Sequence, residues 1–238
     1  MTKNISAQII KTVTKRYPEI IPHLKGKAQW IAFANQEYEG ETKTVAFYLR
    51  TMQGLIRSLY NGDIGGEFID IMANLISGQL RQAYVNGAAD AGLLEIEITG
   101  EMEKELQSFI LAEYNYVDRI FRDIVDARID KTPIEPLLAR AQLWANRWNE
   151  VYNAAKHTVM LIFGGKEIWI LGPTEEHCES CMPLAGIVAF ATEWEASGFK
   201  PQGKMLDCGG WNCKCELVPT TARRSNKPAA QLAKIPRK

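Results

Sequence analysis

The sequence predicts a mainly α-helical protein with a small α/β module near its C-terminus. Three observations predict this class. Apolar residues recur every three or four positions through about the first 157 of the 238 residues. Short runs of β-forming residues then replace that period. All five cysteines lie in the second region, between Cys178 and Cys215. We therefore expect an amphipathic helical body followed by a cysteine-rich module that a zinc ion holds together.

Two amphipathic helices open the predicted body. The first covers residues 43–60, and the turn cluster NGDIGG at 61–66 ends it. The second begins after this cluster, and Gly87 and Gly92 weaken its end. The apolar faces consist of Val45, Leu49, Met52, Ile56 and Leu59 in the first helix, and of Phe68, Met72, Leu75 and Ile76 in the second.

The most regular helical pattern covers residues 101–130, with Thr99 as a candidate N-cap. Pro133 and Pro136 end it, because proline disfavours a continuing helix. A further helix runs from 136 to about 157. The apolar stripes are Met102, Leu106, Phe109, Ile110, Val117, Ile120, Phe121 and Ile124 in the long helix, and Leu137, Ala141, Trp144, Trp148 and Tyr152 in the next.

Three short strands are predicted after the helices, at 166–173, 186–191 and 215–219. Each is an apolar run of β-forming residues, and glycine or proline bounds it. These patterns divide the chain into a helical body at 1–135, a cysteine-rich module at 136–219 and a flexible tail at 220–238. No stretch is apolar for long enough to cross a membrane, and the N-terminus lacks a secretory pattern. We expect a protein made in a reducing cytoplasm.

The charge of the chain is balanced overall but uneven along its length. The tail contains six basic residues and no acidic one, whereas the rest of the chain has an excess of acidic residues. A basic tail on an acidic body predicts an anionic partner, such as DNA or an acidic protein face. The alternative is a solvated terminus without a partner. The candidate contact residues are Arg223, Arg224, Lys227, Lys234, Arg237 and Lys238.

The cysteine spacing predicts a structural zinc site. Cys178 and Cys181 form a C-x-x-C pair, and Cys208, Cys213 and Cys215 form C-x4-C-x-C. Two pairs of thiolates can complete a tetrahedral shell, so four of the five cysteines are expected to bind one ion. Disulfides and unbound thiols are the alternatives that remain open.

The sequence matches none of the catalytic motifs that its cysteines and histidines suggest. The stretch HCESC contains H-x-E, but zinc deaminases place their C-x-x-C far downstream of that motif. A zinc-dependent nuclease needs a general base near the ion, and the chain has only His23, His157 and His177. No phosphate-binding or dinucleotide-binding glycine pattern is present. We therefore expect no enzymatic activity, no catalytic residue and no small-molecule substrate.

The second half of the chain resembles a known family. The stretch RAQLWANRWNEVYNAAKH, the strand GGKEIWILGP, the cysteine pairs and the closing CKCELVP are similar to the C-terminal region of Mu F-like minor head proteins of tailed phages, also called head morphogenesis proteins. The resemblance covers about residues 139–219. Members of that family commonly have a histidine shortly before the final cysteine pair. Cys208 stands near that place here, which favours Cys208 as a ligand and leaves Cys213 or Cys215 spare.

This resemblance implies a structural protein of the virion, present in few copies at the portal vertex or capsid interior. Its expected partners are portal and capsid proteins and packaged DNA, and its expected role is in head assembly. A metal-dependent nuclease or toxin-like hydrolase is the alternative, and a zinc-ribbon adaptor that binds nucleic acid is a third reading. The shortage of histidines argues against the second class, and the acidic body argues against the third.

Overall fold

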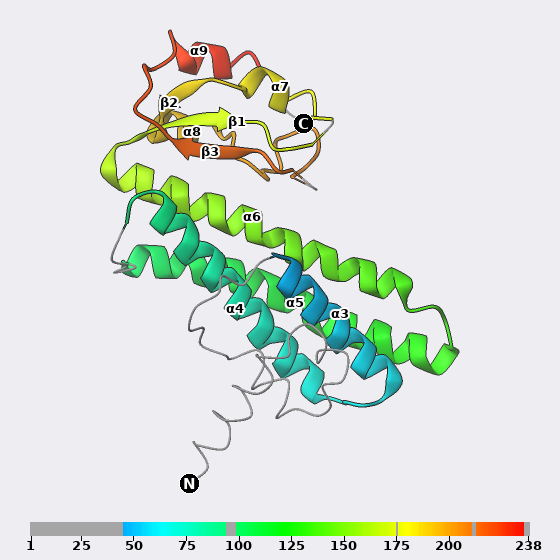
Figure 1. Ribbon diagram of the computed structural model, residues 1–238. Helices are drawn as coiled ribbons and strands as arrows, with labels where there is room; N and C mark the ends of the chain where they lie inside the picture. The colour runs from blue at the N-terminus through cyan, green and yellow to red at the C-terminus, as the bar shows by residue number, and fades with distance from the viewer. Residues whose placement is uncertain (1–44, 94–98, 175, 211–212, 236–238) are drawn as a thin grey trace. The chain divides into compact units, whose positions relative to one another are not determined.

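The computed structural model describes residues 45–93, 99–174, 176–210 and 213–235. Of the described residues 64% are helical, with a three-stranded antiparallel sheet near the C-terminus and a cysteine cluster close to the sheet. Figure 1 labels each element in the ribbon. The predicted fold class is confirmed. In chain order the elements are α3 (Val45–Asn61), α4 (Glu67–Asp90), α5 (Gly100–Asp130), α6 (Glu135–Phe163), β1 (Lys166–Ile170), α7 (Cys181–Leu184), β2 (Val188–Phe190), α8 (Ala191–Ser197), β3 (Glu216–Pro219) and α9 (Pro228–Leu232).

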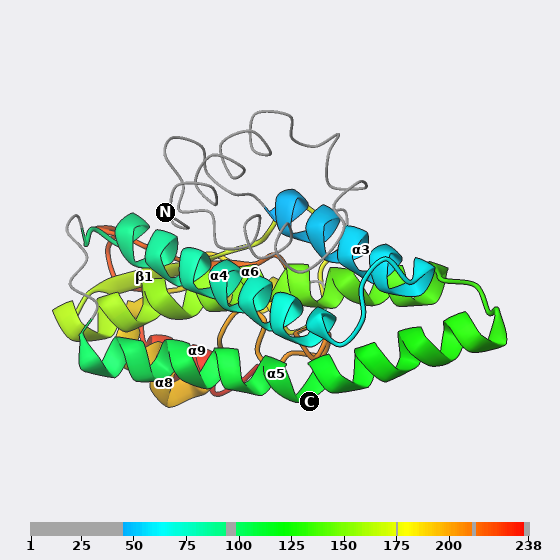
Figure 2. The same cartoon turned by 90° about the horizontal axis from the view of Figure 1, so that it is seen from below.

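The chain forms two compact units. The described part of the first comprises residues 45–82 and 107–148, and the second comprises the rest. The helices α4, α5 and α6 each run from one unit into the other, and Figure 2 shows α5 as one long helix. These units differ from the predicted segments, because a continuous helix crosses each place where the units divide. None of the described helices combines the length and apolarity that a membrane crossing needs.

The first unit is a packed set of helices. Most of the predicted apolar stripes are buried there, as expected for amphipathic helices that share a core. The rings of Phe68 and Phe121 lie 6.0 Å apart, which joins α4 to α5. The side-chain amide of buried Gln79 donates to the carbonyl oxygens of Trp144 and Ala145 at 2.9 and 3.1 Å. These bonds fix the register of α4 against α6.

Two helices of the second unit approach closely at Gly87. This glycine was expected to weaken the end of its helix, yet α4 continues to Asp90. A Cβ atom at Gly87 would lie 2.1 Å from the carbonyl oxygen of Tyr152 in α6. Glycine therefore permits a backbone contact that any side chain would prevent. The propensity penalty of about 1 kcal/mol is offset by this packing.

The sheet has the order β2-β1-β3, with both pairs antiparallel. Glu167 and Trp169 of β1 point to one face and are fully buried, as period-2 alternation requires. On that face Trp169 packs with Trp194 of α8, with ring centroids 5.7 Å apart. The core of this module consists of Trp169, Cys181, Leu184, Ile187, Ala189, Trp194, Phe199, Leu206, Cys215, Leu217, Leu232 and Ile235.

The segment after β3 is packed on the module as far as the structure describes it. The Ser225 amide donates to the carbonyl oxygen of Val188, and the Val188 amide donates to the Ser225 hydroxyl. Leu232 and Ile235 are buried in the core of the module. We expected a flexible tail here, and this packing differs from that expectation. Two apolar residues three positions apart lie on one side of the chain and pack into the module together.

Candidate metal centre

The first cysteine pair lies on a tight turn that leads into α7. The Cys181 amide donates to the Cys178 carbonyl oxygen at 3.0 Å, so the chain folds back over the two residues between them. The two Sγ atoms are then 3.0 Å apart. Cys181 is buried, whereas Cys178 is half-buried. The turn thus directs both sulfurs toward one point, as a C-x-x-C pair needs for binding an ion.

The second pair, Cys213 and Cys215, immediately precedes β3. The side-chain amide of Gln202 donates to both of their carbonyl oxygens, at 2.8 and 3.0 Å. The Gln202 side-chain oxygen accepts from Asn153 of α6 at 2.9 Å. Gln202 is buried and has a φ of 57°, an unusual conformation for a residue with a side chain. This single residue anchors both cysteines to Asn153 of α6.

The two pairs meet in space. The sulfur atoms of Cys181, Cys213 and Cys215 all lie within 4.8 Å of one another, and Cys178 contacts Cys181. The resemblance favoured a set in which Cys213 or Cys215 was spare. The sulfurs of both lie in the cluster of three. Their carbonyl oxygens share the Gln202 amide, which holds the two residues side by side.

Cys208 lies at the edge of this cluster. Its amide hydrogen-bonds to the sulfur of Cys178, which places the two residues side by side. Neither Cys208 nor Cys178 is among the three sulfurs that lie within 4.8 Å of one another, but the Cys178 sulfur is 3.0 Å from that of Cys181. All five predicted cysteines are therefore gathered in one place, and Cys178 is the candidate for a fourth ligand beside Cys181, Cys213 and Cys215.

Hydrogen bonds distribute the protons unevenly among the buried thiols. Bonds from Cys181 and then Cys213 lower the pKa of Cys215 to about 3, and the Gly172 amide adds to this effect. Bonds to Cys213 and Cys215 raise the pKa of Cys181. Since thiolates are the species that bind metals, the cluster already stabilises one ligand in its charged form.

The outer cysteines differ from each other. Burial raises the pKa of Cys178, but hydrogen bonds from Cys181 and Ser180 outweigh burial, so its pKa is lowered overall. Burial is the largest cause that raises the pKa of Cys208 to about 11. The first thiol is thus the better metal ligand of the two.

The donor set fits a thiophilic ion. In tetrahedral zinc sites the Zn–S bond is about 2.3 Å, so neighbouring sulfurs are about 3.8 Å apart. The Cys178 and Cys181 sulfurs, 3.0 Å apart, are closer than that value, and the sulfurs of Cys181, Cys213 and Cys215 lie within 4.8 Å of one another. Four sulfur ligands without an oxygen ligand suit zinc and other metal ions that bind thiolates well. They do not suit magnesium or calcium, which prefer oxygen ligands.

An apolar shell surrounds the sulfurs. Trp169 and Leu217 pack against the cluster from the sheet, and Trp194 packs behind them from α8. The Trp169 indole N–H makes a weak contact with the Cys215 sulfur and has no closer partner among the described residues. Such outer contacts orient ligands and exclude water. Spacing alone could not identify Trp169 or Gln202, because neither belongs to a cysteine motif.

Most other candidate residues lie away from the sulfurs. His177 hydrogen-bonds to Thr174 at 3.2 Å and does not join the cluster. In the tail, Arg224 is paired with Glu193 and lies over the Phe190 ring. Arg223, Lys227 and Lys234 are exposed, whereas Arg237 and Lys238 lie outside the described residues.

Sequence reasoning missed a buried acid–base pair. Nδ1 of His157 lies 2.6 Å from fully buried Glu167, and Nε2 lies 3.3 Å from exposed Glu195. Burial lowers the pKa of His157, but the bonds to the two carboxylates outweigh it and raise the pKa above its usual value. Both ring nitrogens are engaged, so the pair joins α6 to β1 and α8. No motif places these residues together in sequence.

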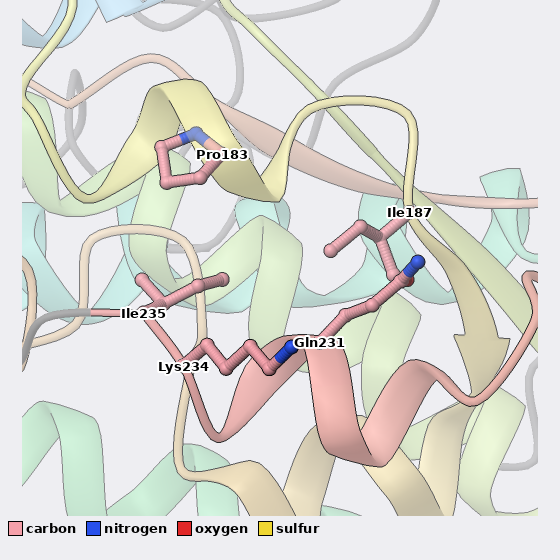
Figure 3. Close-up of a pocket in the computed structure, with 5 residues that line it drawn as sticks. All are labelled: Pro183, Ile187, Gln231, Lys234 and Ile235. Carbon is pink, nitrogen blue, oxygen red and sulfur yellow. The ribbon is translucent and has the colours of Figure 1, made fainter.

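A shallow pocket lies between α7 and α9 and has a volume of about 330 Å³. Figure 3 shows the side chains that line it, which are Pro183, Ile187, Gln231, Lys234 and Ile235. Its lining is mainly apolar and contains no cysteine. The pocket is therefore separate from the sulfur cluster.

We compared the chain with protein-family models, with curated proteins and with solved structures, and none of them matched. The site defines a class only: a mainly helical protein with a thiol-lined candidate metal centre in a small C-terminal module. The likeness to phage head proteins stays a prediction from the sequence.

Proposed function

We propose that the cysteine cluster binds one structural zinc ion that holds the C-terminal module together. The observation that carries this proposal is the set of three sulfurs within 4.8 Å of one another, with a fourth sulfur 3.0 Å from one of them. The ligands come from the turn before α7 and from the segment before β3. One ion therefore links two parts of a module whose apolar core is small.

Metal analysis of the full chain, purified without added metal, tests this role. We expect about one zinc per chain, and Cys181→Ser should lose the metal because it removes a buried ligand. Glu179→Gln is the matched control, since Glu179 lies in the same turn and is exposed. Five freely titrating thiols with no bound metal in the wild-type chain would sink the proposal.

The biological role that best suits this chain is that of a non-enzymatic minor head protein of a tailed phage or prophage. The support is the sequence resemblance over residues 139–219, together with a mainly helical chain and a closing cysteine module. The helical part would bind portal or capsid proteins. The exposed basic residues Arg223, Lys227 and Lys234 would contact packaged DNA or an acidic protein face.

Particle incorporation tests this role directly. The tagged chain would be produced with the portal and capsid genes that neighbour its own gene, and the purified particles would be probed for the tag. We expect a few copies per particle. Absence from intact particles, or genomic neighbours unrelated to a virion, would contradict the proposal. Cleavage of DNA that depends on His157 would instead favour the hydrolase alternative.

A further inference from the structure

Two loops at the edge of the cysteine cluster are fastened to each other. Ser180 is fully buried between Cys178 and Cys181. Its hydroxyl oxygen accepts the Asp207 amide at 2.7 Å and donates to the Asp207 carboxylate at 2.9 Å. This pair of bonds fixes the residue before Cys208 against the first cysteine turn.

The turn after Cys208 is equally constrained. Gly209 and Gly210 both have positive φ values, of 61° and 83°, which glycine adopts readily. A Cβ at Gly210 would lie 2.1 Å from the Gln202 carbonyl oxygen. The loop therefore packs tightly on the residue that anchors the second cysteine pair. Cys208 is held in place beside Cys178 from both sides.

Cys208 is surplus to a four-coordinate ion, yet it contacts one ligand. Its amide donates to the Cys178 sulfur, so the two thiols are neighbours. Both residues are half-buried, as is Cys213, whereas Cys181 and Cys215 are 1% and 3% exposed. An oxidant can thus reach Cys178 and Cys208 before it reaches Cys181 and Cys215.

We infer that Cys178 and Cys208 form a peroxide-sensitive thiol pair, in which formation of a disulfide removes Cys178 from the ion and releases the metal. This inference rests on the proposed metal centre and adds a modification site to it. Zinc would retain three sulfur ligands after the reaction. An ion in such an incomplete shell is lost more easily, because the fourth thiolate contributes to affinity.

The chemistry balances with hydrogen peroxide as the oxidant. The Cys178 thiolate attacks one peroxide oxygen, the O–O bond breaks, and the leaving hydroxide takes a proton to become water. The Cys208 thiol then gives up its proton and attacks the sulfur of the resulting sulfenic acid, and the hydroxide that is expelled takes a proton to become the second water. Two thiols and one peroxide give one disulfide and two waters. The two sulfurs lose the two electrons that the peroxide gains.

The test compares the zinc-loaded full chain with its Cys208→Ser variant. Both are treated with hydrogen peroxide, released zinc is followed with a chromogenic chelator, and disulfides are mapped by mass spectrometry after alkylation. We expect the wild type to release its zinc as a Cys178–Cys208 disulfide forms. The variant should bind zinc normally and release it at least about tenfold more slowly, because it lacks the resolving thiol. Glu179→Gln is the control and should behave like the wild type.

Three results would overturn the inference. A Cys208→Ser variant without zinc, beside a loaded wild type, would make Cys208 a ligand. Equal rates of zinc release from the two chains would show that Cys208 has no role in the release. A first disulfide between other cysteines would show that Cys178 and Cys208 are not the reactive pair. If the wild type itself contains no zinc, the proposed metal centre is wrong, and the thiol pair is tested on the metal-free chain. A Cys178–Cys208 disulfide in the peroxide-treated chain would support the pair, and any other first disulfide would contradict it.

Discussion

Single residues determine how the module is joined to the helix that precedes it. His157 of α6 reaches buried Glu167 on β1, and this carboxylate retains one oxygen without a hydrogen-bond partner among the described residues. An isolated buried carboxylate is costly, so the imidazolium that faces it stabilises the fold. Glu195 of α8 faces the second ring nitrogen, and it is largely exposed.

The pair predicts a stability that depends on pH. The folded pKa of His157 lies above its unfolded value of about 6.5. The stabilisation is therefore complete below about pH 6.5 and is lost as the pH rises through the folded pKa. We expect urea unfolding of the zinc-loaded protein to require less urea at pH 9 than at pH 6, with a loss on the order of 1 kcal/mol.

His157→Gln provides the reference for this measurement, because glutamine keeps a donor but does not titrate. The difference in unfolding free energy between wild type and variant should shrink as the pH rises, which removes the contribution of other titrating groups. A difference that stays constant between pH 6 and pH 9 would show that His157 is neutral in the folded protein.

At the scale of elements, the last helix changes the interpretation of the basic tail. Composition alone favoured a flexible segment, because six basic residues are spread among small and polar ones. Composition could not show that Leu232 packs into the core of the module, because the residues that surround it there are distant in sequence. Deleting residues 221–238 would therefore damage the core as well as remove charge.

Two variants separate charge from packing in this segment. Arg223, Lys227 and Lys234 changed together to Gln should leave thermal unfolding unchanged and weaken DNA retention. The slope of log K against log salt should become shallower by at most about 0.9 per charge removed. Leu232→Ala should instead destabilise the module by about 2–5 kcal/mol, because it leaves a cavity in the core.

Gln231→Ala is the matched control for the packing variant, since Gln231 is the exposed neighbour of Leu232. DNA retention that is unaffected by the triple charge variant would remove the tail from any DNA contact. If Leu232→Ala is as stable as the wild type, the packing of Leu232 in the core of the module would be contradicted.

At the scale of the whole molecule, periodicity predicted most elements well. The buried stripe of α5 includes Met102, Leu106 and Ile124 as expected, because a helix of this length repeats its pattern many times. The continuation of α6 to Phe163 was not foreseen. The cysteine spacing identified the site, but Gln202 depends on contacts that no local pattern encodes.

Removal of the metal should affect the two units unequally. We expect a strong chelator to reduce the protection of the amides of β1 and β3 against hydrogen exchange. The amides of α3 and of the rest of the first unit should keep their protection, because the ion contributes folding free energy only where its ligands lie. Hydrogen exchange with mass spectrometry measures this by segment. Cys181→Ser should give the same pattern without chelator. Equal loss of protection in both units would indicate that the ion supports the whole fold.

The hydrogen bonds of Gln202 to Asn153, Cys213 and Cys215 affect when the metal centre can form during translation. Cys178 and Cys181 leave the exit tunnel well before Cys213 and Cys215. Gln202 can bridge Asn153 of α6 and the second cysteine pair only after that pair has been translated. The module also needs Leu232, near its last described residues. We therefore expect metal capture to follow translation of nearly the whole module, so that the nascent chain carries exposed thiols until its final step of assembly.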